Sequence, residues 1–425
     1  MMNRIKATLA HARSRIHKLS APPLPLPSPK PVVSARRFPE EPDYYGPGGF
    51  HRVSLGDTFD SARYTILRKI GYGQYSTVWL ARDLKCQRYV AVKLLRADCY
   101  GTPHHIFERE ILARISDVSR TSSHPGCRHL LPCREQFSHR GPNGDHVGLV
   151  FDVLGHHLSF QAAKYKDGRL PVKAVKEIAR QLLRGLDFLH GECGVIHTDL
   201  KPTNILLELE TPDETISQYL ESVPPRTTND HNGAVVPLRE VITTPLVSEV
   251  ALLHVRIIDF GVYRIQSPAL RAPEVTLGAP WDTGVDIWSL GCLIVEFVQG
   301  IILFSGNASK NGTWTAEDDQ LARMVEILGQ FPPGLLSQGR RSAEFFDAKG
   351  IIPCIPSHGA LFRIPNMKAT SLERLLNGQV KLFIRPADMP ETEIGTFIDF
   401  IQGMLEIDPT VRKSAAELLQ HGWLS

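Results

Sequence analysis

Residues 195–207 of this 425-residue chain read VIHTDLKPTNILL, the most informative segment of the sequence. Two further segments follow it, IIDFG at residues 257–261 and RAPE at residues 271–274. Two others precede it, GYGQYSTV at residues 71–78 and VAVK at residues 90–93. Each segment alone is a weak signal, but five of them in this order make a chance match a poor explanation.

The glycines of GYGQYSTV indicate a loop over a nucleotide. Because Gly71 and Gly73 carry no Cβ, their backbone N–H groups can approach phosphate oxygens closely. The residues that follow, TVWLARD, continue as a strand, whereas a dinucleotide-binding fold requires a helix there. A Walker-type loop is excluded because the chain has no Gly-Lys-Ser/Thr. We therefore expect a hairpin tip above a nucleotide, with an ordinary glycine turn as the alternative.

A lysine lies within the next apolar strand pattern. Lys93 lies among apolar neighbours, where its charge is costly unless it is paired. Glu110, in the helical run HHIFEREILARI, can supply a carboxylate, and such a pair can hold the α- and β-phosphates of a nucleotide. The alternatives are a lysine that reaches solvent from the strand end and a glutamate on a solvated helix face.

In order and spacing these motifs resemble the protein-kinase signature set, and the chain is identified as a eukaryotic-type protein kinase from about Arg63 to Trp423. The segment FDVLGHHL, Thr198 in the catalytic segment and Ser76 in place of the third loop glycine look like the SR-protein kinases. The segments ALRAPEV and APWDT are similar to fungal members of that group. The resemblance implies an α+β, bilobal fold with a small, mostly β lobe and a large helical lobe.

The resemblance also implies the roles of individual residues. Asp199 should accept the proton of the substrate hydroxyl or orient it, and Lys201 should neutralise the transferring phosphoryl group. Asn204 and Asp259 should hold Mg²⁺, and ATP should be the phosphate donor. The nucleotide-binding positions that the resemblance implies are Ile70, Gly71, Gly73, Val78, Ala91, Lys93, Glu110, Phe151, Asp152 and Leu154. Glu274 and Arg412 should form a buried ion pair, and Asp286 should hold the catalytic loop.

The order of segments predicts how the domain is divided. Residues 1–50 are basic and proline-rich, so we expect a disordered segment there. The kinase domain should occupy residues 51–425, with the small lobe at about 61–153 and the large lobe at about 154–425. Five prolines and the sequence NDHNG at about 208–249 predict an insertion of low order.

Two departures from the family pattern bear on activity. Thr198 stands where many kinases have arginine, so activation without a phosphorylated activation loop is implied. The stretch from Asp259 to Glu274 is about ten residues shorter than usual in the family, and it offers Ser267 and Tyr263 as its hydroxyl groups before Arg271. A kinase is the preferred interpretation, and a nucleotide-binding pseudokinase that acts as a scaffold is the alternative.

Charge predicts a basic partner. Residues 1–39 hold eight Lys or Arg and no acid, which leaves 40 basic residues against 45 acidic ones in the rest. This balance argues against nucleic acid and agrees with the arginine/serine-rich protein substrates that the resemblance implies. Asp319 and Glu326 share one helix face and match acidic docking positions of SR-protein kinases, although Ile301 replaces a further expected acid. The alternative is a solvated face on which Arg323 pairs with both acids.

Location and assembly are less constrained. Seven dispersed cysteines without a C-x-x-C pair suit a reducing compartment, and no segment is apolar and long enough to span a membrane. We expect a monomer in the cytoplasm and nucleus. Residues 1–20 are basic and free of acids, as in mitochondrial transit peptides and in plain disordered tails, so mitochondrial targeting remains an alternative.

Overall fold

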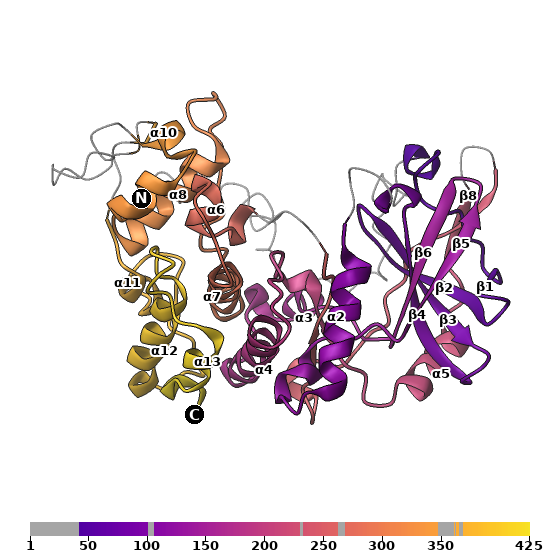
Figure 1. Ribbon diagram of the computed structural model, residues 1–425. Helices are drawn as coiled ribbons and strands as arrows, with labels where there is room; N and C mark the ends of the chain where they lie inside the picture. Colours follow the sequence, from indigo (N-terminus) through magenta and orange to yellow (C-terminus); the bar gives the residue numbers. More distant parts are fainter. Residues whose placement is uncertain are drawn as a thin grey trace, which may run out of the picture.

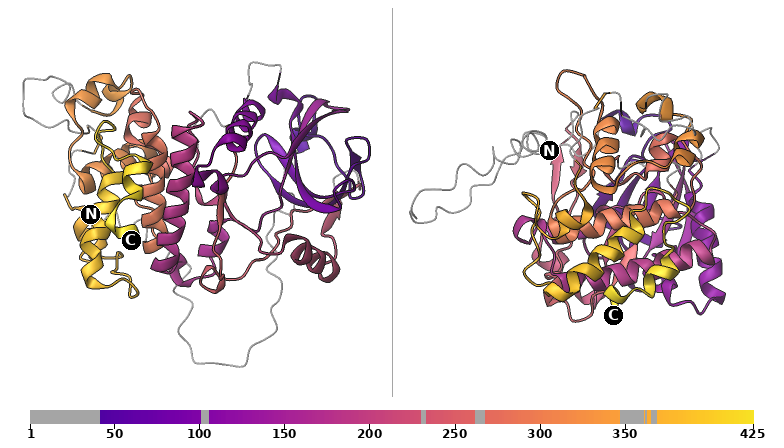
Figure 2. Two further views of the ribbon diagram at one scale, coloured as in Figure 1. Left: turned by 60° about the horizontal axis from the view of Figure 1, so that its bottom comes forward. Right: turned by 90° about the vertical axis from the view of Figure 1, so that its left-hand side faces the viewer.

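The structure is a computed structural model that describes residues 42–100, 106–229, 233–261, 268–346, 361, 363–364 and 369–425. A sheet lies at one end of the molecule and a group of helices at the other, as Figure 1 and the left view of Figure 2 show. This arrangement confirms the predicted bilobal α+β fold. None of the helices in the described ranges has the length and apolar character needed to cross a membrane.

The small lobe is built on a six-stranded antiparallel sheet with the order β1-β2-β3-β4-β6-β5. Its strands are β1 (Thr58–Phe59), β2 (Tyr64–Tyr72), β3 (Ser76–Asp83), β4 (Arg88–Leu95), β5 (Glu135–Gly141) and β6 (Gly144–Phe151). Side chains alternate between two hydrophobic clusters along the strands, because successive strand residues point to opposite faces of the sheet. Trp79 and Val92 pack in the outer cluster, whereas Leu80 and Ala91 join the cluster that includes Leu112 of helix α2 (Glu108–Thr121).

The large lobe is organised around helices α4 (Val172–Gly191) and α7 (Gly284–Gln299), which pack against each other. Helix α4 buries one side through residues spaced three and four apart, as the sequence predicts, whereas α7 is buried on nearly every side. Helix α12 (Glu391–Met404) covers α7 from outside. The other helices are α3 (Leu158–Ala162), α5 (Pro212–Ser222), α6 (Pro273–Leu277), α8 (Ala316–Leu328), α9 (Pro333–Gln338), α10 (Ser342–Phe345), α11 (Leu372–Leu376) and α13 (Ala415–Leu419).

A short antiparallel pair of strands brings the two chemical segments together. Strand β7 (Ile205–Leu207) directly follows Asn204, the last residue of the catalytic segment 195–204, and β10 (Val255–Ile257) ends two residues before Asp259. In this pair Ile205 lies opposite Ile257. Segments separated by about fifty residues in the sequence therefore meet at one edge of the large lobe.

The prediction of a low-order insertion at 208–249 is wrong for most of its described residues. The insertion forms α5 and a hairpin of β8 (Thr227–Asn229) and β9 (Val235–Pro237). Pro212 stands in the first turn of α5, where proline is well tolerated, so it starts a helix instead of preventing one. Buried Ile216 and Glu240 anchor the segment, and Figure 1 shows α5 beside the sheet of the small lobe.

A buried ion pair joins the start of α6 to the loop before α13, as the resemblance implies. Both side chains of Glu274 and Arg412 are fully buried, and two nitrogen-oxygen contacts of 2.7 and 3.0 Å join them. Arg412 also donates to the Gly284 carbonyl oxygen at 2.9 Å. Because the desolvated carboxylate has lost its water, its stability depends on this arginine.

We expect the Arg412→Met substitution to lower the free energy of unfolding by about 3–5 kcal/mol, because it leaves the Glu274 carboxylate buried without a counter-charge. Urea denaturation measures the effect. The matched control is Arg385→Met, whose partner Glu391 is 83% exposed, and here the loss should stay below about 1 kcal/mol. Equal losses in the two variants would contradict the importance of burial.

Three histidines hold the segment before β1 against the β5–β6 hairpin. The His51 ring lies 4.5 Å from the His139 ring and 5.2 Å from the His146 ring, measured between centroids. Burial, together with the charges that His139 and His146 would carry, lowers the pKa of His51 to about 4, and the Asp57 carboxylate opposes this shift. The folded chain therefore keeps His51 neutral over a pH range in which an unfolded histidine is protonated.

The free energy of unfolding should fall as the pH is lowered from about 6.5 to about 4, because in this range His51 binds a proton in the unfolded chain but not in the folded chain. A His51→Phe variant removes this proton uptake, so its stability should change less between pH 7 and pH 5. Urea denaturation at the two pH values provides the comparison. An unchanged difference would show that His51 is not a source of the pH dependence.

Candidate active site

A lysine between two carboxylates joins three parts of the chain. Lys93 Nζ of β4 lies 2.5 Å from Glu108 Oε1 of α2 and 2.7 Å from Asp259 Oδ1, beyond β10. The Lys93 ammonium lowers the pKa of Asp259, and burial raises that of Glu108 to about 7. The two carboxylates raise the pKa of Lys93 above its usual range despite its burial. Lys93 is therefore a fixed cation in a cleft lined by Asp259.

The structure contradicts the prediction that Glu110 is the partner of Lys93, because Glu108 makes that contact. Glu110 is exposed and pairs instead with the neighbouring Arg109 at 3.0 Å. The signal that distinguishes them is spacing: Glu108 lies four residues before Leu112, on the buried face of α2, whereas Glu110 does not.

The catalytic segment is held in shape by Asp286 of α7. Its two carboxylate oxygens accept hydrogen bonds of 2.8 Å from the backbone N–H groups of His197 and Thr198, and His190 Nε2 lies 2.8 Å away. Thr198 has φ of 69°, a left-handed conformation that is strained for a β-branched residue. The Asp286 contacts compensate for this strain, and they agree with the role that the resemblance implies.

Asp199 lies at the centre of the predicted phosphoryl-transfer residues. Lys201 Nζ lies 2.5 Å from Asp199 Oδ2, and Asn204 Nδ2 donates to the Asp199 carbonyl oxygen at 3.0 Å. The other carboxylate oxygen, Oδ1, is buried and accepts no hydrogen bond from the described residues. Burying an oxygen without a hydrogen bond costs free energy, so this atom is suited to accept a hydrogen bond from the hydroxyl group of a substrate.

A cavity of about 460 Å³ lies between the lobes beside these groups. Lys93, Asn204 and Asp259 lie in its wall, and Lys201 lies there as well. The other predicted nucleotide positions in its wall are Ile70, Gly71, Gly73, Val78, Ala91, Phe151, Asp152 and Leu154. The wall also contains residues that the sequence did not predict, among them Leu131, Leu206 and the insertion residues 239–242.

These side chains fit ATP and Mg²⁺. An apolar wall suits a base, the Lys93 ammonium suits phosphate, and the carboxylate of Asp259 with the amide of Asn204 offers oxygen ligands. Two protein ligands are enough for Mg²⁺, which usually retains water and phosphate oxygens. The described residues contain no cluster of three or more acids, histidines or cysteines able to hold a metal alone.

The acidic side chains of α8 are engaged within the chain. Asp319 is buried, lies 2.8 Å from Arg323 Nε and accepts the Asn307 N–H at 2.9 Å. Glu326 is buried as well, 7% exposed, so the alternative of a solvated face is wrong for both residues. Their role in docking a substrate remains a prediction, and neither carboxylate lies open on the surface.

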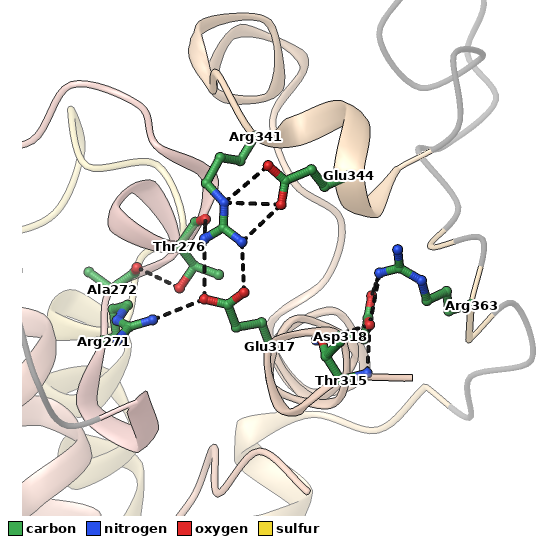
Figure 3. Close-up of polar contacts among 9 residues, drawn as sticks. All are labelled: Arg271, Ala272, Thr276, Thr315, Glu317, Asp318, Arg341, Glu344 and Arg363. Atoms are coloured by element: carbon green, nitrogen blue, oxygen red, sulfur yellow. Dashed lines mark hydrogen bonds and ion pairs between the residues drawn. The ribbon is translucent and has the colours of Figure 1, made fainter. Parts of the chain in front are cut away.

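Two neighbouring acids of α8 also contact arginines of the chain (Figure 3). Glu317 lies between Arg271, at 3.1 Å, and Arg341, at 2.7 Å. Asp318 contacts Arg363 at 3.0 Å while it also caps the start of α8. Ser267 and Tyr263 of the shortened segment lie outside the described residues, as do residues 1–41. The predicted disorder of residues 1–50 is wrong for residues 42–50, because Pro42–Tyr45 forms a 3-10 helix and the side chain of Phe50 is buried.

Comparisons of the sequence with known proteins show similarity to protein kinases. A sequence profile described as "Protein kinase domain" matches residues 64–230 and 246–424. A serine/threonine protein kinase of Aspergillus fumigatus is 32% identical, with 95% of each chain covered. Protein kinase dsk1 of Schizosaccharomyces pombe is 29% identical, covering 92% of this chain and 86% of dsk1. SRSF protein kinase 3 of Mus musculus is 26% identical, covering 91% and 90% of the two chains.

A Glu108→Gln variant should lose about 10²-fold in kcat/KM for phosphoryl transfer, because Lys93 loses the charge that positions it. The matched Glu110→Gln variant removes an acid two residues away and should retain near-normal activity, since its carboxylate is exposed. Steady-state kinetics on both variants, with thermal melting to verify folding, gives the test. A larger loss in Glu110→Gln would reinstate that residue as the partner.

Proposed function

Because this chain belongs to the protein kinase family, in its SR-protein kinase branch, and is a serine/threonine kinase, we propose that it transfers the γ-phosphoryl group of ATP to serine in arginine/serine-rich proteins. The single observation that carries the proposal is the buried Asp199 Oδ1, which has no hydrogen-bond partner among the described residues, beside Lys201 and Asn204. This oxygen can accept a hydrogen bond from a substrate hydroxyl group, and it lies next to a cavity of the size of a nucleotide.

The residues of the site divide the work of transfer. Asp199 orients the substrate hydroxyl and accepts its proton, and Lys201 stabilises the negative charge that develops on the transferring group. Lys93, fixed by Glu108, binds phosphate oxygens, and Asn204 with Asp259 would hold the Mg²⁺ ions that neutralise further charge when they are bound. Catalysis is then mainly positioning and electrostatic stabilisation.

Two observations support a basic substrate. The chain beyond residue 39 carries five more acidic than basic residues. Relatives named SRPK and SRSF protein kinase 3 share 29% and 26% identity with this chain over 90% or more of its length. The α8 acids support the proposal less than their sequence suggested, because the chain's own arginines already contact three of them.

The pseudokinase alternative gains no support, since the residues of phosphoryl transfer converge and these relatives are named as kinases.

The wild-type protein should incorporate radiolabel from ATP into serines of an arginine/serine-repeat peptide, and Asp199→Asn should reduce the rate by about 10²-fold or more. Replacing the arginines of the peptide with alanine should raise KM, and added salt should weaken the arginine peptide alone, because charge attraction is screened over about 8–10 Å at physiological salt. Incorporation no greater than in Asp199→Asn would refute the kinase proposal. Equal KM for the two peptides would refute only the substrate class.

A further inference from the structure

Residues 238–247 of the insertion pass the nucleotide cavity, where residues 239–242 form part of its wall, and they are attached to the small lobe at one end. The Glu240 N–H donates to the Lys69 carbonyl oxygen at 2.8 Å. The Glu240 carboxylate is buried, accepts the Tyr219 hydroxyl at 2.7 Å and lies 3.3 Å from Arg68 Nε. Arg239, adjacent to Glu240, forms a parallel bridge with Lys69, directly before the cavity residue Ile70. The backbone at this point is therefore fixed against β2.

The other end of the segment is attached to the large lobe. Gln161 Nε2 of α3 donates to Thr244 Oγ1 at 3.1 Å and to the Pro245 carbonyl oxygen at 2.7 Å. Gln161 Oε1 also accepts the Val247 N–H at 3.1 Å. Because both ends are anchored, residues 239–242 are held in the cavity wall and do not form a loose loop.

Arg239 brings an uncompensated positive charge to this wall. Its side chain is half-buried, and no hydrogen bond or ion pair joins its guanidinium to another described residue. Its Nε is fully buried and finds no acceptor in the part of the chain that the structure describes. The neighbouring acid, Glu240, is already engaged with Arg68 and Tyr219. A partly desolvated guanidinium without an anion is costly, so the position is suited to a negatively charged ligand.

The surroundings narrow the choice of ligand. Arg239 lines the same cavity as Tyr72 and Gly73 of the glycine loop, and as Lys93. The neighbouring His157 is kept neutral, because burial and then the charge of Arg239 lower its pKa to about 4, so it adds no second positive charge beside Arg239. The protein kinase profile matches residues up to 230 and again from 246, so Arg239 lies outside the part of the domain that the family shares.

We propose that Arg239 binds the phosphate chain of the nucleotide, so that the insertion adds a cation to the ATP site beyond those of the common kinase domain. This inference rests on the proposed use of ATP. Its physical basis is that a guanidinium forms strong, often bidentate hydrogen bonds with phosphate oxygens. The insertion then sets nucleotide affinity in addition to joining the two lobes.

Isothermal titration calorimetry of the full chain with ATP, ADP and adenosine, in the presence of Mg²⁺, tests the contact without relying on catalysis. Arg239→Ala should weaken ATP and ADP binding roughly five- to tenfold and leave adenosine binding unchanged, because only the phosphates carry the charge that Arg239 recognises. Arg239→Lys should lose less than about threefold, since it retains the charge. The matched control Arg140→Ala removes an exposed arginine that does not line the cavity and should bind all three ligands normally.

Equal ATP affinity in Arg239→Ala and wild type would overturn this inference alone. Equal weakening of ATP and adenosine would also overturn it, because Arg239 would then support the wall of the cavity without contacting phosphate. If the wild-type chain bound neither ATP nor ADP, the proposed function and this inference would fall together. Thermal melting without nucleotide should give a midpoint for Arg239→Ala no lower than that of wild type, because the substitution breaks no hydrogen bond or ion pair with a described residue and removes a costly buried charge.

Discussion

The Lys93 ammonium is the interaction on which the rest of the site depends. It contacts the carboxylates of Glu108 and Asp259, and thereby joins a central strand of the small lobe, helix α2 and the segment beyond β10. Three charges inside a protein are stable only when their geometry is mutually satisfied. The relative position of the lobes, the orientation of α2 and the placement of a metal ligand are therefore coupled through one side chain.

Local motifs allowed much of this site to be predicted from the sequence. The spacing of Asp199, Lys201 and Asn204 is fixed within one short segment, so these residues meet wherever the segment is folded. The residue that pairs with Lys93, Glu108 or Glu110, could not be identified from a short motif in this way. It depends on where α2 begins, and Phe107, with φ of 54°, places Glu108 in the first turn on the buried face. Because the sequence does not show where α2 begins, the predicted partner of Lys93 was wrong by two residues.

The remaining errors arose where tertiary contacts override composition. Prolines suggested low order in the insertion, but Glu240 contacts Arg68 and Lys69 of the small lobe and Thr244 contacts Gln161 of the large lobe, and these partners are distant in the sequence. Helical periodicity placed Asp319 and Glu326 on one face correctly, yet it could not show that the face is covered. Burial of an acid depends on whether an arginine such as Arg323 is available to pair with it, and that is a property of the folded chain.

A double-mutant cycle on Lys93 and Glu108 tests the central claim most directly. Single-turnover transfer from ATP to an arginine/serine-repeat peptide would be measured for wild type, Lys93→Met, Glu108→Gln and the double variant. If the two residues act only as a pair, the double variant should be no slower than Lys93→Met alone. Losses that multiply, so that the double variant is slower than Lys93→Met by the full factor of Glu108→Gln, would show that the residues act independently and contradict this account.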